Sequence, residues 1–274
     1  MNRVGILTFH SANNFGALLQ AVSLQKTIIE RGNVECELID YKPEFIRKDY
    51  SISPFKNMHP KVIIKSALRI PDKIKRNSKF QTFREENTVC SKQCLSEGDF
   101  KNICNSFDEI VVGSDQVWNY NLTEHDMHYF LPEIGASVKK VAYAASTGGA
   151  DFSTQESNKM ILSLQNFSDI SVRESASKIA LGQRLKEKYI EVVLDPVFLT
   201  SKNNWMQLAA KPVKKDYRSP LSEPHRSPVL PARRSALYES ASKASSGLQR
   251  AYPRTAVPVK VRKASQKRHP RRSR

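Results

Sequence analysis

The feature that most constrains the fold is a regular alternation, through residues 1–206, of short apolar runs with longer amphipathic stretches. A strand-length run followed by a stretch with helical spacing, repeated several times, is typical of a parallel sheet covered by helices. The sequence therefore predicts an α/β fold with one Rossmann-like, doubly wound parallel sheet. The predicted strands are residues 4–8, 35–41, 107–113, 140–148, 170–172 and 192–196.

The connections between these runs indicate helices with different clarity. Apolar residues recur at helical spacing along residues 17–28, and Gly32 ends that helix. Further helices are expected at residues 153–165 and 173–182.

Residues 42–87 are basic and interrupted by proline, with a helical pattern at 62–68, and we interpret them as an excursion over the sheet. The dense basic segment at 61–84 could contact a polyanionic or lipid-linked ligand. A solvated helical face is the preferred interpretation, because charge runs on helices usually face water.

The chain changes character near Pro212. Residues 213–274 hold 17 Lys and Arg against 3 Asp and Glu, and they contain no Ile, Phe, Trp, Met, Cys or Asn. Such a segment cannot bury enough apolar surface to offset the entropy of ordering, so we predict a disordered tail. We divide the chain into a body at residues 1–206 and a linker with a basic Ser/Pro/Arg-rich tail at 207–274. The abrupt change favours a frameshift or a fusion over a genuine basic tail.

Most of the net charge of +17 lies in that tail. The body is therefore nearly neutral, and it lacks the charge pattern of a specific nucleic-acid binder. The residues before the first predicted strand are too few for the apolar core of a signal peptide, and no run reaches membrane-spanning length. These observations predict a cytoplasmic protein.

The cysteines of the body are Cys36, Cys90, Cys94 and Cys104. Their spacing lacks the close second pair and the nearby histidine of tetrahedral zinc sites. Reduced structural thiols are therefore preferred over a metal site, and no metal or cofactor is predicted.

A compact polar turn follows the apolar run that ends at residue 112. The turn contains Gly113, Ser114, Asp115, Gln116 and Trp118. In an open parallel sheet, ligands bind beyond the carboxyl ends of the strands, and Gly113 would let a ligand approach the backbone. Ser114 and Asp115 are also common helix caps, but Gln116 and Trp118 make the turn richer than a cap requires.

The loop from His10 to Gly16 connects the first predicted strand and helix, where backbone N–H groups and the helix dipole favour an anion. Its single glycine, Gly16, does not match the G-x-G-x-x-G dinucleotide pattern. Asn13 and Asn14 suit hydrogen bonds to hydroxyl or phosphate oxygens, and a helix-capping role is equally favoured. His10 is the one histidine of the body at the predicted sheet edge, which makes it a candidate acid or base.

Two further polar residues follow predicted strands at the same edge. Ser146 ends the run at 140–148, and taken alone it favours a structural role. Arg173 follows the run at 170–172, and a guanidinium there can bind a carboxylate or phosphate bidentately. An ion pair of Arg173 with Glu174 or Asp195 is the slightly favoured alternative.

Five sequence blocks stand in a fixed order along the body. They are SANNFGALLQA at residues 11–21, DEIVVGSDQVWN at 108–119, AYAAS at 142–146, SVRE at 171–174 and LDP at 194–196. Together they resemble the polysaccharide pyruvyl transferase family. The resemblance covers about residues 1–206, which look like the N-terminal half of a family with two Rossmann-like domains, similar to the GT-B glycosyltransferase architecture.

The resemblance implies an activity in exopolysaccharide biosynthesis, namely transfer of a pyruvyl group from phosphoenolpyruvate to two hydroxyls of a sugar as a ketal. The implied partners are phosphoenolpyruvate and a sugar or lipid-linked oligosaccharide, with a peripheral position at the membrane left open. Arg173 matches the position for donor binding, and His10 and Asp115 are the candidate acid and base. The other expected substrate-binding residues are Asn13, Asn14, Gly16, Gly113, Ser114, Gln116, Trp118 and Ser146.

Members of the family also carry an arginine–histidine motif in their C-terminal domain, and nothing after Pro212 resembles it. We therefore expect a truncated transferase with weak or no activity. Two other functions stay open at this point. One is a nucleotide-sugar-dependent glycosyltransferase of GT-B type, and the other is a non-catalytic domain whose basic tail binds a polyanion with steep salt dependence.

Overall fold

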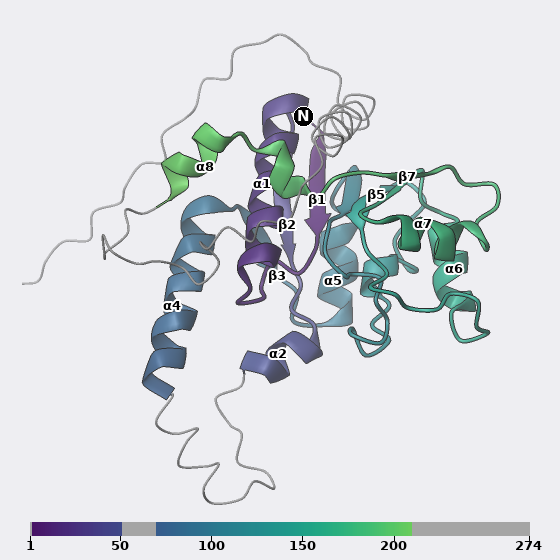
Figure 1. Ribbon diagram of the computed structural model, residues 1–274, viewed down its shortest axis with the longest axis horizontal. Coiled ribbons are helices and arrows are strands. Elements are labelled where there is room, and N and C mark those ends of the chain that lie inside the picture. Colours follow the sequence, from purple (N-terminus) through teal and green to yellow (C-terminus); the bar gives the residue numbers. More distant parts are fainter. Residues whose placement is uncertain (1, 51–69, 210–274) are drawn as a thin grey trace, which may run out of the picture.

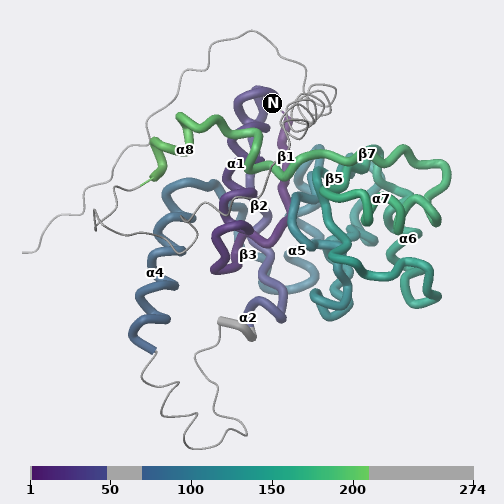
Figure 2. Tube along the Cα trace, in the orientation of Figure 1, coloured from purple at the N-terminus to yellow at the C-terminus, as the bar shows by residue number. Residues whose placement is uncertain are grey.

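The computed structural model describes residues 2–50 and 70–209, shown as ribbon and tube in Figures 1 and 2. These residues contain a seven-stranded sheet in the order β3-β2-β1-β4-β5-β6-β7, with every neighbouring pair parallel. The strands are β1 (Arg3–Leu7), β2 (Glu35–Asp40), β3 (Cys90–Gln93), β4 (Glu109–Val112), β5 (Lys139–Ala145), β6 (Asp169–Val172) and β7 (Ile190–Val192). The predicted α/β fold with a parallel sheet is confirmed. The helical pattern expected at 62–68 and the tail from 213 lie outside the described residues.

Two strands differ from the sequence-based expectation. β3 was not predicted, because its sequence Cys-Ser-Lys-Gln is polar and its side chains at the sheet edge are mostly exposed. β7 ends at Val192 rather than running through to Pro196. Pro196 instead begins the 3₁₀ helix η2 (Pro196–Leu199), which the Asp195 carboxylate caps by accepting a hydrogen bond from Val197 N.

The helices connect and cover the strands. They are α1 (Phe15–Gly32), α2 (Glu44–Tyr50), α4 (Ile70–Asn87), α5 (Glu97–Cys104), α6 (Asn158–Leu164), α7 (Ser175–Gly182), α8 (Lys202–Leu208) and the 3₁₀ helix η1 (His128–Phe130). α6 begins later than the predicted residue 153. The cause is local, since the Ser157 hydroxyl donates to the carbonyls of Phe152 and Thr154 and holds this segment in a turn.

Both faces of the sheet are buried, as the two-residue period of strand side chains requires. Val4 and Ile6 of β1 and Val111 of β4 face α1, whose buried side chains include Ala21, Leu24 and Ile28. The alternate residues Leu7 and Val112 join the cluster on the opposite face, together with side chains of α5, α6 and α7. The sheet is therefore wrapped on both sides, which is the doubly wound arrangement.

Figure 1 shows α4 and α8 beside α1 on one side of the molecule, with α6 and α7 beside the other half of the sheet. Leu18 and Val22 of α1 pack against Phe80 of α4, and Leu208 of α8 joins this cluster. None of the described helices is long and apolar enough to cross a lipid bilayer.

The strand order reverses direction at β1. The chain runs outward from β1 to β2 and β3 and then returns to β4 on the other side of β1. In open α/β sheets the ligand crevice lies at this point, outside the carboxyl ends of the strands. The loops that follow β1 and β4 are the ones in which the sequence predicted the site.

Candidate functional site

A group of polar side chains gathers where β4, β5, β6 and β7 end, and we call it the edge cluster. Its members come from four different loops that the parallel sheet brings to one edge. They are Ser114, Asp115, Ser146, Arg173, Glu174 and Asp195. The cluster thus contains one guanidinium and three carboxyl groups.

Arg173 lies between two of these carboxylates. Its Nη1 donates to Asp195 Oδ2 at 3.3 Å, and its Nε lies 3.5 Å from Glu174 Oε2. Both ion pairs that the sequence spacing suggested are present. The Arg173 side chain is still 32% exposed, so solvent and small ligands reach it from outside the sheet.

Asp195 is held in place from several directions. Its Oδ2 accepts a hydrogen bond from Ser114 Oγ at 2.9 Å as well as the one from Arg173. Its Oδ1 accepts from Val197 N at 3.0 Å. These contacts fix the carboxylate and, through it, the position of the Arg173 guanidinium.

Glu174 is held in a similar way on the other side of Arg173. Its Oε1 accepts hydrogen bonds from Ser146 Oγ at 2.6 Å and from Ser177 Oγ. Ser146 is almost fully buried, and its Oγ also accepts from Gly148 N at 3.0 Å. Ser146 thus supports the Glu174 carboxylate, and its predicted contact with substrate stays a prediction.

Asp115 has an unusual backbone conformation and a shifted carboxyl pKa. Its φ of 87° is a left-handed value that is uncommon for a residue with a side chain. Burial raises the pKa of the Asp115 carboxyl, and Asp195 adds to the rise, although the Gln116 N–H and the Arg173 charge act against it. A strained, partly buried carboxyl with a raised pKa beside a cation has the properties of a general acid.

Gly113 and Gln116 contact protein atoms. A Cβ at Gly113 would lie 3.0 Å from Thr8 Cβ and 3.3 Å from Leu24 Cδ2, so the close packing of β4 against β1 and α1 explains the glycine without a ligand. Gln116 Oε1 accepts a hydrogen bond from Asn119 Nδ2 at 2.9 Å. The side chains of Gln116 and Asn119 both lie close to Gly148, whose φ of 57° and tight surroundings also require glycine.

Trp118 lies in the hydrophobic core. Its side chain is fully buried, its Nε1 donates to Tyr129 O at 3.0 Å, and its ring packs against Phe130 and Phe167. In this position the indole anchors the loop after β4 from inside, and a contact of Trp118 with substrate stays a prediction.

His10 is also buried, at the end of β1. Its Nε2 lies 3.2 Å from Asp40 Oδ1, and its Nδ1 lies 3.2 Å from Thr8 O. Burial alone would raise the pKa of Asp40, but the hydrogen bond and charge of His10, together with Lys42, lower it below its ordinary value. With both ring nitrogens beside protein oxygens and no exposed surface, His10 stabilises the end of β2 in this structure.

The loop before α1 is fixed by α1 and by α4. Asn14 caps α1, since its Oδ1 accepts from Ala17 N at 3.2 Å, and Gly16 lies in the exposed first turn. Asn13 Nδ2 donates to Asn77 Oδ1 of α4 at 2.7 Å. The capping interpretation of Asn14 is therefore present in the structure, and ligand contact at either residue stays a prediction.

Two arginines of α4 hold the same loop through its backbone. Arg76 Nη2 donates to Asn13 O at 2.9 Å. Arg84 donates from Nε to His10 O at 3.1 Å and from Nη2 to Ser11 O at 3.2 Å. The conformation of the β1–α1 loop therefore depends on the position of α4.

The sequence reasoning missed a second polar group, which we call the His128 cluster. Tyr41 OH donates to Asp126 Oδ2 at 2.7 Å, and His128 lies 2.6 Å from Asp126 Oδ1 and 2.9 Å from Glu97 Oε2. Burial lowers the pKa of His128, but the two carboxylates outweigh it and raise the pKa overall. Only the Asp-x-His spacing is a local signal, since the other members come from distant parts of the chain.

Within residues 2–50 and 70–209, no three side chains of His, Cys, Asp or Glu are arranged to bind a metal ion together. The four cysteines are free thiols, and burial raises the pKa of Cys36 to about 12. Cys36 is therefore protonated and unreactive at neutral pH.

A family model described as polysaccharide pyruvyl transferase matches residues 14–234 of the chain. The matched region contains the whole edge cluster and α1, and it extends into the basic tail. No curated protein and no solved structure matches the chain.

Proposed function

The chain belongs to the polysaccharide pyruvyl transferase family, and we propose that its edge cluster binds phosphoenolpyruvate and passes the pyruvyl group to two hydroxyls of a sugar. The observation that carries the proposal is the placement of Asp115, with its raised pKa, beside the partly exposed guanidinium of Arg173. An anion-binding group and a proton donor thus lie together at the carboxyl edge of the sheet, where such sheets bind ligands.

The reaction needs a cation, an acid and a base. One sugar hydroxyl adds to C2 of the enolpyruvyl group while a proton is delivered to the C3 methylene, which becomes a methyl group. The second hydroxyl displaces phosphate at C2, giving a cyclic ketal and inorganic phosphate. A positioned acid lowers the barrier of the protonation step, and fixed positive charge stabilises the departing phosphate.

We assign donor binding to Arg173. A guanidinium presents two parallel N–H groups that match a carboxylate or a phosphate, and the contacts with Asp195 and Glu174 already hold it in place. The donor anion would take over part of the guanidinium from these carboxylates.

We assign proton donation to Asp115. The raised pKa keeps a larger share of this carboxyl protonated than an ordinary aspartate, which supplies the proton and removes one negative charge from beside the anionic donor. Glu174 and Asp195 then serve to position Arg173. The attacking hydroxyl also needs a base, and the phosphate that leaves can accept that proton.

We place the reaction in the cytoplasm, with a surface-polysaccharide sugar as acceptor, either as free oligosaccharide or linked to a lipid. This placement rests on the family.

The test is calorimetric titration of the full chain with phosphoenolpyruvate. Saturable binding is expected for the wild-type protein, with at least a tenfold loss of affinity in Arg173→Ala. A smaller loss is expected in Arg173→Lys, which keeps the positive charge but lacks the two parallel N–H donors of the guanidinium. A melting curve for each variant separates lost binding from lost folding. Phosphate release with added sugar acceptors then reports on transfer.

Two results would overturn the proposal. If a nucleoside diphosphate binds more tightly than phosphoenolpyruvate, the site is that of a nucleotide-sugar-dependent glycosyltransferase. If neither binds and the protein instead retains polyanions with steep salt dependence, the binding module in the tail is the better interpretation. Lys186→Glu, an exposed change in the turn after α7, is the matched control for surface charge.

A further inference from the structure

A second feature of the molecule is a large groove between α1, α4 and α8. It has a volume of about 970 Å³, within the range of ligand-binding cavities. Helix α8 lies beside α1 and α4 in Figure 1 and forms one of its walls. No residue of the edge cluster lines it.

The floor and walls of the groove are apolar. Leu18 and Phe80 are buried at its base, while Phe15 is 72% exposed at its edge and packs with a ring distance of 4.7 Å against Phe80. Trp205 and Leu208 of α8 form the opposite wall. An exposed aromatic beside a continuous apolar trough is unusual for a surface that faces only water.

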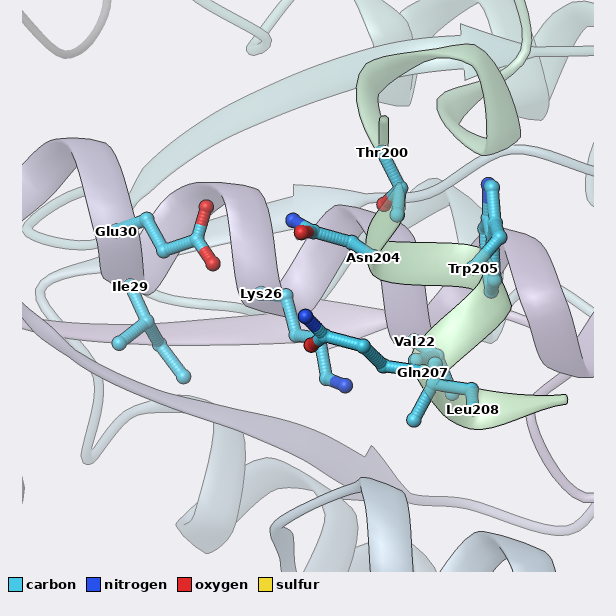
Figure 3. A pocket seen from close by; sticks show the side chains of 9 residues that line it. All are labelled: Val22, Lys26, Ile29, Glu30, Thr200, Asn204, Trp205, Gln207 and Leu208. Atoms are coloured by element: carbon cyan, nitrogen blue, oxygen red, sulfur yellow. The ribbon is translucent and has the colours of Figure 1, made fainter. Parts of the chain in front are cut away.

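Figure 3 shows the other side of the same wall. There α8 lies across α1, with Leu208 next to Val22, and the smaller hollow on that side is lined by polar side chains such as Lys26 and Glu30. Trp205 lines both spaces. Apolar side chains such as Ile29 also line that hollow, so apolar surface lies on both sides of α8, and the larger of the two spaces is on the α4 side.

The α4 rim of the groove is cationic. Lys75, Arg76 and Lys79 line it and are exposed, with Asp72 as the one carboxylate among the lining residues. The Arg76 guanidinium already lies over the Phe80 ring, 5.6 Å from its centre, and donates a hydrogen bond to Asn13 O. Lys75 and Lys79 are one turn apart on the helix and can meet the same anion.

An apolar trough with cations along one side fits a ligand that has a hydrocarbon chain and an anionic head. A second copy of this chain is an unsuitable occupant of the groove, because its cationic rim would repel the same rim of the first copy. Residues 213–274 are unsuitable for the same reason, because they are strongly basic. We propose that the groove holds the hydrocarbon chain of a lipid phosphate, with the phosphate on Lys75 and Lys79. This inference goes beyond the transfer reaction, because no step of that reaction involves the groove.

Tryptophan fluorescence gives a direct test with the full chain. Trp205 lines the groove, whereas Trp118 is fully buried in the core, so a ligand in the groove changes the emission of Trp205 alone. Dodecyl phosphate, added below its micelle concentration, is expected to give a saturable change that disappears in Trp205→Phe. Dodecyl maltoside has the same chain without the phosphate, and inorganic phosphate is the head alone. Both are expected to bind at least tenfold more weakly.

Charge reversal tests the rim. The double variant Lys75→Glu with Lys79→Glu is expected to weaken dodecyl phosphate at least tenfold and to leave dodecyl maltoside unchanged. Lys186→Glu, on the opposite part of the body, is expected to change neither. Calorimetry repeats the measurement without relying on the tryptophan, and melting curves confirm that the variants are folded.

The outcomes are distinct. Equal binding of the two dodecyl compounds, or no binding of either, overturns the proposal, as does dodecyl phosphate binding that survives the double variant. A concentration-dependent dimer lost in Phe15→Asp would identify a second copy as the occupant instead. Phosphoenolpyruvate titration of the same samples reports separately on the edge cluster, so the two proposals can fail independently.

Discussion

Each half of the sheet edge has a carboxyl group near a basic side chain, but the pKa values of the two carboxyl groups shift in opposite directions. At the ends of β1 and β2, His10 is fully buried against Asp40, whose pKa is lowered. At the ends of β4 to β7, Asp115 has a raised pKa and a strained backbone, beside an arginine that solvent reaches. The sequence proposed His10 and Asp115 alike as acid and base. The surroundings separate the two sites, since they favour the charged form of the Asp40 carboxyl and disfavour the charged form of the Asp115 carboxyl.

The largest expected effect is on the chemistry of Asp115. Asp115→Asn keeps the shape of the side chain and its tolerance of a left-handed backbone but cannot donate a carboxyl proton. We expect phosphate release from phosphoenolpyruvate, measured with a sugar acceptor, to fall by roughly 100-fold or more, as for other general acids. Calorimetry should show phosphoenolpyruvate binding retained or tightened, because a negative charge has been removed. Unchanged turnover would return Asp115 to a structural role.

His10→Ala is expected to act on stability rather than on the ligand. It opens a cavity in a fully buried position and removes the partner of Asp40, which together should cost about 2–4 kcal/mol in the free energy of unfolding. Urea denaturation measures the loss. Phosphoenolpyruvate affinity of the folded variant should stay within threefold of the wild type. A loss of affinity at full stability would show instead that His10 takes part in the site.

The two carboxyl groups should also respond to acid in opposite directions. Asp40 contributes stability above the ordinary aspartate pKa of 3.8, and this contribution is lost as the pH falls through its lowered pKa. Asp115 gains stability as the pH falls through its raised pKa toward 3.8.

Melting temperatures of two variants measure this contrast. At pH 7, Asp115→Asn should melt above the wild type and Asp40→Asn below it. The higher melting temperature of Asp115→Asn should approach that of the wild type as the pH falls through the raised pKa of Asp115. The lower melting temperature of Asp40→Asn should approach it only at lower pH. Parallel curves for both variants would contradict the opposite pKa shifts.

The smallest effect is expected at Asn14, where a cap and a ligand contact were equally favoured by the sequence. Asn14→Ala removes the hydrogen bond to Ala17 N and should cost about 0.5–2 kcal/mol, whereas Asn14→Ser should restore most of it. If phosphoenolpyruvate affinity follows stability in both variants, the cap explains the residue. If the serine variant is stable but binds more weakly, Asn14 also contacts the ligand.

Apolar strands at the centre of the sheet could be predicted from the sequence, and the polar edge strand β3 could not. β1 and β4 are mostly apolar runs because helices cover both sides of the sheet. β3 has a polar sequence because only its backbone is used by its neighbour. β7 was placed too late because the run before Pro196 reads as strand until Asp195 caps η2.

The candidate site, like the strands, could be predicted from the sequence only in part. The sequence placed the candidate residues at the carboxyl edge of the sheet and named both possible ion pairs of Arg173, because the carboxyl ends of parallel strands meet. It could not distinguish ligand contacts from contacts inside the protein. Gly113 and Trp118 have the same signature in either role, and only the positions of Thr8 and Tyr129 reveal the packing explanation.

The arginines of α4 link the groove to the loop at the end of β1. Arg76 and Arg84 hold the backbone of the β1–α1 loop, and the same helix carries the cationic rim of the groove. A ligand that shifts α4 must therefore disturb or reinforce the loop at the sheet edge. If a groove ligand changes the affinity of the β1–α1 loop for a second ligand, thermodynamic reciprocity requires that second ligand to change affinity in the groove by the same factor.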